Sequence, residues 1–149
     1  MRRVAYVSRV KRDFGETELN NIMLQAIANN KRDDVTGMLI YHGDTLFQAL
    51  EGPEDNVDAC YQRIAGDPRH WDIERVYWRN VDTRAFSDWS MGLATPTQFH
   101  LSPTITIHSF TEIVARLEAV SDLDISFGKQ RLVSSMSDFM ESVGLDAPA

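Results

Sequence analysis

The hydrophobic pattern of the chain changes period several times, and each change marks a predicted element. Runs rich in apolar and β-branched residues predict strands at 4–8, 35–41, 45–50, 73–81 and about 89–93. Apolar residues at helical spacing predict a first helix over about 17–29. We expect this helix to stop at Asn29 and Asn30, because asparagine tolerates the left-handed backbone found at helix ends.

A second helix is predicted to start at Gly52 and Pro53, since proline suits the first helical turn, and to end at 66–68. A hairpin turn is predicted at His42, Gly43 and Asp44. The resulting order predicts an α+β fold with a ferredoxin-like βαββαβ core and a fifth strand. Both helices should then cover one face of a mixed sheet.

The last third of the chain has a different pattern. Residues 95–107 form a connector with two prolines, after which Ser109 and Glu112 predict the capping box of a third helix. A fourth helix, ended by Gly144, is marked by apolar residues at Leu132, Val133, Met136, Phe139, Met140 and Val143. We expect these two C-terminal helices to pack on the opposite face of the sheet. The predicted division is a core of 1–95 and an extension of 96–149.

The composition limits the number of domains, the kinds of partner and the cellular compartment. The 149 residues suit one domain, and the net charge of -7 argues against nonspecific binding to nucleic acid or to an anionic membrane. Cys60 is the only cysteine, so no intramolecular disulfide can form, which fits a reducing compartment. The apolar run after Arg3 is too short for a signal peptide or a membrane span. A cytoplasmic location is expected.

Common catalytic motifs are missing from the sequence. The four histidines lack metal-ligand spacing, and neither a phosphate-binding glycine loop nor a serine elbow is found. Cys60 lies on the apolar stripe of the second predicted helix, where a core thiol is more usual than a nucleophile. We therefore expect no metal site and no enzymatic activity.

Two inward-facing polar side chains are candidates for a functional site. Tyr6 shares a face of the first strand with Val4 and Ser8, and Gln48 is flanked by leucines in the third strand. A buried amide needs a hydrogen-bond partner. That partner could be neighbouring backbone, Tyr6 or a ligand, and the strand alone leaves these readings open.

Several motifs occur together in this chain. They are Val4-Ala5-Tyr6-Val7-Ser8, Asn30, Thr36-Gly37, Gln48 followed by Leu50-Glu51-Gly52, Arg63-Ile64-Ala65-Gly66-Asp67-Pro68-Arg69-His70 and Phe86-Ser87-Asp88-Trp89-Ser90-Met91. Tyr6 precedes Asn30 by 24 positions, Gln48 by 42 and Trp89 by 83. Over residues 1–95 the set resembles the BLUF family, the sensors of blue light using FAD.

The resemblance implies a flavin ring between the first two helices, lined by Ile22 and Ile64. Asn30, assisted by Asn29, would hydrogen-bond the polar edge of the ring, because an amide offers both a donor and an acceptor. The ribityl or phosphate tail would emerge at the end of the second helix, near Arg63, Asp67, Arg69 and His70. For these last residues an exposed, solvated helix end is an equal alternative. The implied cofactor is FAD, with FMN or riboflavin also open.

The resemblance also implies a reversible photocycle, in which Tyr6 gives up an electron and a proton and Gln48 rotates or changes tautomer. Trp89 and Met91, expected on one face of the fifth strand, would carry the signal onward. Leu46 departs from the family pattern, where an aromatic residue is expected. The implied output is a separate signalling protein or a homo-oligomer.

Two rival functions remain at this point. One is an enzyme on a similar small scaffold, acylphosphatase-like or monooxygenase-like, although no glycine-rich anion loop follows the first strand. The other is a non-flavin interaction module in which Tyr6 and Gln48 bond only to each other.

Overall fold

A five-stranded mixed sheet forms the centre of the protein. The computed structural model describes residues 1–11, 13–119 and 135–141. The strands are β1 (Arg2–Val10), β2 (Thr36–His42), β3 (Thr45–Gly52), β4 (His70–Asn80) and β5 (Gly92–Ala94), in the spatial order β4-β1-β3-β2-β5. The first four strands pair antiparallel, whereas β5 runs parallel to β2. β3, the strand that carries Gln48, is the central strand of the sheet.

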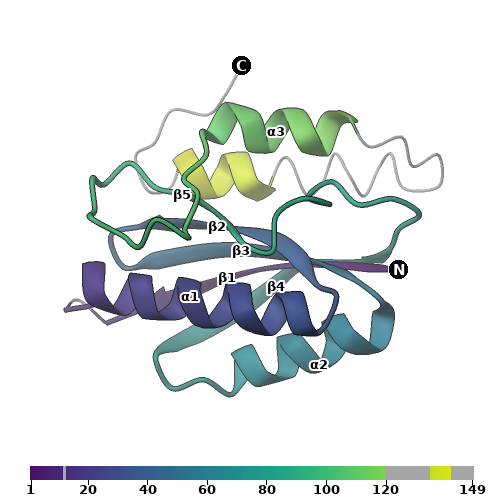
Figure 1. The fold of residues 1–149 in the computed structure, drawn as a ribbon, viewed down its shortest axis with the longest axis horizontal. Helices are drawn as coiled ribbons and strands as arrows, with labels where there is room; N and C mark the ends of the chain where they lie inside the picture. The colour runs from purple at the N-terminus through teal and green to yellow at the C-terminus, as the bar shows by residue number, and fades with distance from the viewer. Residues whose placement is uncertain (12, 120–134, 142–149) are drawn as a thin grey trace.

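Helices cover both faces of this sheet (Figure 1). α1 (Glu16–Arg32) and α2 (Glu54–Ala65) lie on one face. α3 (Phe110–Ala119) and the helical residues 135–141 lie on the other. This arrangement confirms the predicted α+β fold, including the C-terminal helices on the opposite face. Of the fourth predicted helix, Leu132, Val133, Val143 and Gly144 lie outside the described residues.

Two apolar cores follow from the strand periodicity of two. Val4, Leu46 and Leu50 face α1 and α2, in the same core as Leu19 and Met23. Their neighbours Ala5, Phe47 and Ala49 face the other way and pack with residues of α3 and 135–141. The sheet thus separates a core under α1 and α2 from a core under α3.

The first helix does not stop at Asn29 and Asn30 as predicted. It continues to Arg32, and the left-handed residue is Asp34, with a φ of 55°. Asn30 is only 2% exposed, so its side chain faces the core and does not end the helix. The tolerance of asparagine for left-handed backbone was therefore a misleading signal here.

The second helix starts two residues later than predicted. Gly52 is the last residue of β3, Pro53 is the N-cap, and α2 begins at Glu54. A Cβ at position 52 would lie 2.6 Å from the carbonyl oxygen of Asp34, so glycine is needed for this close approach rather than for a helix start. The predicted end is confirmed, since Gly66 is the C-cap.

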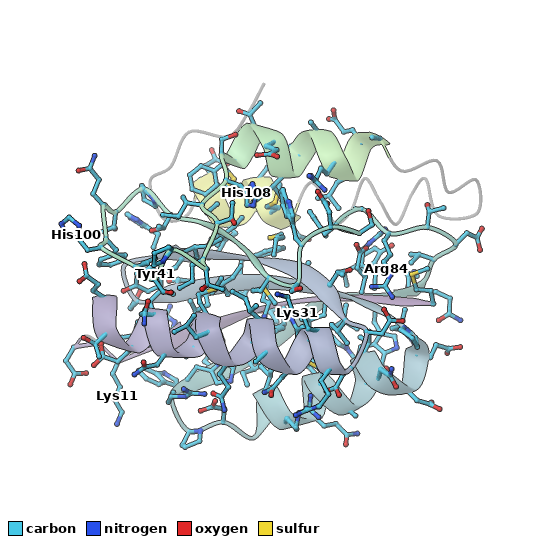
Figure 2. The ribbon with its side chains drawn as sticks, in the orientation of Figure 1. Lys11, Lys31, Tyr41, Arg84, His100 and His108 are labelled. Carbon is cyan, nitrogen blue, oxygen red and sulfur yellow. The ribbon has the colours of Figure 1, made fainter. Side chains whose placement is uncertain are left out.

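The capping box predicted at Ser109 and Glu112 forms in half. Ser109 Oγ accepts a hydrogen bond from the Glu112 N–H at 3.1 Å, which satisfies one free donor of the first turn of α3. The Glu112 carboxylate instead approaches His108 Nδ1 at 3.1 Å. Figure 2 shows His108 on the α3 side of the sheet and Lys31 on the α1 side.

Candidate functional site

A cavity of about 200 Å³ lies between α1, α2 and the sheet. Its apolar walls come from Ile22, Met23, Ala26, Leu39, Leu46, Cys60, Ile64 and Met91. Its polar side chains are Tyr6, Gln25, Asn29, Asn30, Gln48, Arg63, Asp67, Arg69 and His70. An apolar cavity with a few placed polar groups is typical of a site for a small organic ligand. Of the predicted site residues, Trp89 alone is not in the cavity wall.

Tyr6 and Gln48 form the buried polar floor of this cavity. They are direct cross-strand neighbours in β1 and β3, and they are 2% and 6% exposed. The Tyr6 hydroxyl donates a hydrogen bond to Gln48 Oε1. Gln48 Nε2 in turn donates to Met91 Sδ at 3.6 Å. One amide therefore connects a phenol on one side with a thioether on the other, and a change in its orientation would alter both contacts.

Burial raises the pKa of the Tyr6 phenol well above its ordinary value, and the nearby Cys60, Tyr61 and Asp67 act in the same direction. The Tyr6 ring also meets the Tyr61 ring edge-on, with 5.8 Å between centroids. Tyr6 is therefore a neutral hydrogen-bond donor throughout the neutral pH range.

The raised pKa of Tyr6 predicts a specific alkaline pH dependence of stability. The folded protein keeps this proton when the unfolded chain loses it at about pH 10, so the stabilising effect is complete below that pH and falls as the pH rises further. We expect the free energy of unfolding, measured with urea, to fall faster above pH 10 in the wild type than in Tyr6→Phe. The difference in slope should be up to about 1.4 kcal/mol per pH unit. Equal slopes for both proteins would contradict the raised pKa.

Asn30 links the cavity to the segment before β5. Its Nδ2 donates to the Ser90 carbonyl oxygen at 2.7 Å, and its Oδ1 accepts from Cys60 Sγ at 3.8 Å. Asn29 is less buried and accepts a hydrogen bond from Arg32 Nη1 at 3.4 Å. Asn30 thus combines burial with a fixed amide orientation, as a residue that reads the edge of a ligand should.

Basic side chains gather at the open end of the cavity, each already paired with an acceptor. Arg63 bonds to Asp33, and Arg69 bonds to Asp67 and Gln25. The guanidinium of Arg32, with that of Arg63, lowers the pKa of Asp33 to about 2. An anionic group on a bound ligand would have to replace these carboxylate partners.

His70 also lines the cavity. One ring nitrogen lies 2.9 Å from Ser8 Oγ and the other 2.5 Å from the Ile64 carbonyl oxygen. The imidazole therefore ties β4 to both β1 and the end of α2. This structural role accompanies its place in the cavity wall.

Trp89 and Met91 do not lie on one face of a strand, so that prediction is wrong. Both precede β5, which starts at Gly92. Met91 packs in the core under α1 and α2, whereas Trp89 packs in the core under α3. Residues 87–91 form a turn instead of an extended strand, so their side chains do not alternate between the two faces of the sheet.

Cys60 is a cavity residue that sequence reasoning assigned only to the core. It lies one helical turn before Ile64 on α2, so the i, i+4 rule places both on the same face. Burial raises the pKa of its thiol. It therefore acts as a neutral donor towards Asn30, and its spacing from Ile64 was the signal that could have found it.

The donor set fits a flavin. Apolar side chains from both helices can hold a planar aromatic ring, and the amides of Asn30 and Gln48 can meet the donors and acceptors of its polar edge. The arginines at the open end lie where a ribityl or phosphate tail would leave. Within the described residues no cluster of three or more His, Cys, Asp or Glu could hold a metal ion.

Comparisons with known proteins agree with this fit. Residues 1–92 match the family model "Sensors of blue-light using FAD". The chain is 32% identical over 103 residues to photoactivated adenylate cyclase subunit beta of Euglena gracilis, covering 68% of this chain and 12% of that protein. It is 34% identical over 88 residues to the blue light- and temperature-regulated antirepressor BluF of Escherichia coli K12, covering 59% and 22%.

Solved structures show the same fold. The dark-state structure of BlrB, a BLUF protein, superimposes with a TM-score of 0.61 at 26% identity, over 90% of this chain and 96% of that one. A bacterial light-regulated adenylyl cyclase superimposes with the same score and identity, over 95% of this chain and 35% of the cyclase. This chain spans only about an eighth of the cyclase beta subunits that it matches. It belongs to the BLUF family, the sensors of blue light using FAD.

Proposed function

We propose that this chain is a blue-light photoreceptor whose flavin lies in the cavity between α1 and α2. The observation that carries the proposal is the buried contact series from Tyr6 through Gln48 to Met91. It joins a redox-active phenol, an amide that can reverse its orientation and the residue just before β5 within one cavity. A metabolic enzyme or a simple interaction module has no need of this combination.

The flavin supplies absorption of blue light and a reversible acceptor for one electron. Tyr6 supplies that electron from its phenol and the accompanying proton from its hydroxyl, and both return to Tyr6, so nothing is consumed. Gln48 passes the proton and then rotates or changes tautomer, which places its donor and acceptor ends differently. The lasting change is in hydrogen bonds from Gln48, including its contact with Met91.

The natural cofactor proposed is FAD, because the family description names it and Arg63 and Arg69 stand at the open end of the cavity. FMN or riboflavin would satisfy the ring contacts equally well. Chromatography of flavin released from the purified protein distinguishes the three.

The proposed output is a contact with a separate signalling protein or a change in a homo-oligomer, in a cytoplasmic protein without an enzymatic activity of its own. Among curated relatives, output differs: some are named as adenylate cyclases and one as an antirepressor. Acidic net charge supports a protein partner rather than nucleic acid. Across the described residues, no helix has the length and apolar character needed to cross a membrane.

An absorbance spectrum tests the proposal directly. The purified protein should show a flavin spectrum in the dark, a small red shift after blue light and full thermal recovery in the dark. Protein that stays colourless and fails to bind excess FAD would overturn the proposal in favour of a non-flavin module. Flavin that is bleached to its reduced form by light, without a red shift, would overturn the proposed photocycle.

A further inference from the structure

The short segment from Asp88 to Gly92 connects the two cores. Trp89 and Met91 are two residues apart but pack on opposite faces of the sheet. Their common backbone is fixed between them, because Gly37 N–H donates to the Trp89 carbonyl oxygen at 3.0 Å and Asn30 Nδ2 donates to that of Ser90 at 2.7 Å. A displacement of this backbone segment would therefore move Met91 and the Trp89 indole together.

Two polar side chains stack on the Trp89 indole. The Arg116 guanidinium, from α3, lies 3.9 Å from the ring centroid on which it stacks. The His108 ring stacks on the indole with 3.7 Å between centroids and 25° between planes. The indole is only 7% exposed, so these contacts leave it little room to move. A cation over the face of tryptophan is the most favourable cation–π geometry.

An ion pair holds Arg116 in turn, and a contact with a carboxylate holds His108. Arg116 pairs with both carboxylate oxygens of Asp88, the residue next to Trp89. Glu112, one turn earlier in α3, lies 3.8 Å from Arg116 and 3.1 Å from His108 Nδ1. The side chain of Arg116 thus holds the backbone neighbour of Trp89 as well as its ring. α3 and the Asp88–Gly92 segment are joined at one place by charge, stacking and packing.

We propose that Arg116 and His108 are positioning residues that couple Met91, through Trp89, to α3. The inference rests on the proposed flavin photocycle, because the Gln48 rearrangement supplies the movement of Met91. When that contact changes, the segment shifts, the indole shifts with it, and α3 follows because Arg116 holds both. Without Arg116 the cavity still responds to light, but α3 no longer does.

Amide hydrogen exchange of residues 110–119, measured in the dark and under blue light, tests the coupling. In the wild type we expect exchange in α3 to differ by about two- to fivefold between the two conditions, the equilibrium change that one partly exposed cation–π contact supports. Arg116→Met should remove that difference and keep the flavin red shift. Arg116→Lys keeps a cation over the indole and should restore most of it.

Arg84→Met is the matched control. Arg84, labelled in Figure 2, lies just before the same segment, and its guanidinium hydrogen-bonds to Asp34 and Thr36. We expect the light-dependent exchange of α3 to survive this change. His108→Gln is a second test of the coupling and should weaken the light-dependent difference in α3 exchange without altering flavin binding.

The outcomes separate the two hypotheses. A wild type with no flavin red shift overturns the proposed function. A wild type with a normal red shift but light-independent exchange in α3 overturns only the coupling. So does an Arg116→Met variant whose α3 still responds to light as the wild type does.

Discussion

Tyr6→Phe should keep its flavin and lose the blue-light red shift completely. Phenylalanine fills the same space in β1, so the cavity and its apolar contacts remain. It cannot release a proton with its electron, and it cannot donate to Gln48 Oε1, which is the contact seen in the structure. The acceptor left buried should also lower the free energy of unfolding by about 1–3 kcal/mol. Difference spectra before and after blue light measure the first effect, and urea unfolding the second.

Tyr41→Phe provides the control for stability. Tyr41 is buried, 4% exposed, in the same core, and its hydroxyl donates to the Phe14 carbonyl oxygen at 3.2 Å. It is outside the cavity wall, so this variant should lose similar stability and keep a normal red shift. A normal photocycle in Tyr6→Phe would refute the assigned role of Tyr6. A lost red shift in both variants would attribute the effect to general destabilisation.

The fold was predictable because its signals are local and mutually consistent. Period-two strands and period-3.6 helices identified each of the first six elements, and βαββαβ order then has a known sheet arrangement. The errors occur where tertiary contacts override local preference. Asn30 resembled a helix cap but is buried in α1, and Gly52 resembled a helix start but allows β3 to approach Asp34.

The site was predicted from residue spacing, yet its most informative detail was not. Strand periodicity places Tyr6 with Val4 and Ser8, and Gln48 with its flanking leucines, whereas only the structure makes Tyr6 and Gln48 direct neighbours. Trp89 and Met91 have the spacing of strand neighbours as well, but a turn places them on opposite faces. Periodicity predicts a shared face only inside a regular strand, and no local signal showed that β5 starts as late as Gly92.

The late start of β5 also explains why Glu51 is buried. Since residues 81–91 form a loop, their backbone N–H groups lack strand partners and need other acceptors. The Glu51 carboxylate, 0% exposed, accepts hydrogen bonds from the N–H groups of Ala85 and Phe86. It also pairs with Arg3 Nε at 3.0 Å, and Arg3 is equally buried. One carboxylate therefore fixes the loop that leads to Trp89 while it neutralises a buried guanidinium.

Glu51→Gln should destabilise the protein by about 3–5 kcal/mol, because the substitution leaves the Arg3 charge uncompensated in the core. The amide keeps the shape of the side chain, so the loss does not come from a cavity but from the charge and from the one acceptor oxygen that an NH2 group replaces. A domain of this kind has a total stability of about 5–15 kcal/mol, so the variant should unfold at much lower urea concentration. Equilibrium urea unfolding of the flavin-bound protein measures the difference.

Glu54→Gln is the matched control, since it removes the same charge three residues later. Glu54 pairs with Arg2, the neighbour of Arg3, but its side chain is 49% exposed. Exposed ion pairs contribute only about 0–1 kcal/mol, so this variant should stay close to the wild type. Replacing both buried partners, in Arg3→Met with Glu51→Leu, should recover part of the lost stability, because no lone charge remains in the core. Equal losses for Glu51→Gln and Glu54→Gln would show that burial does not decide the strength of the Arg3 pair.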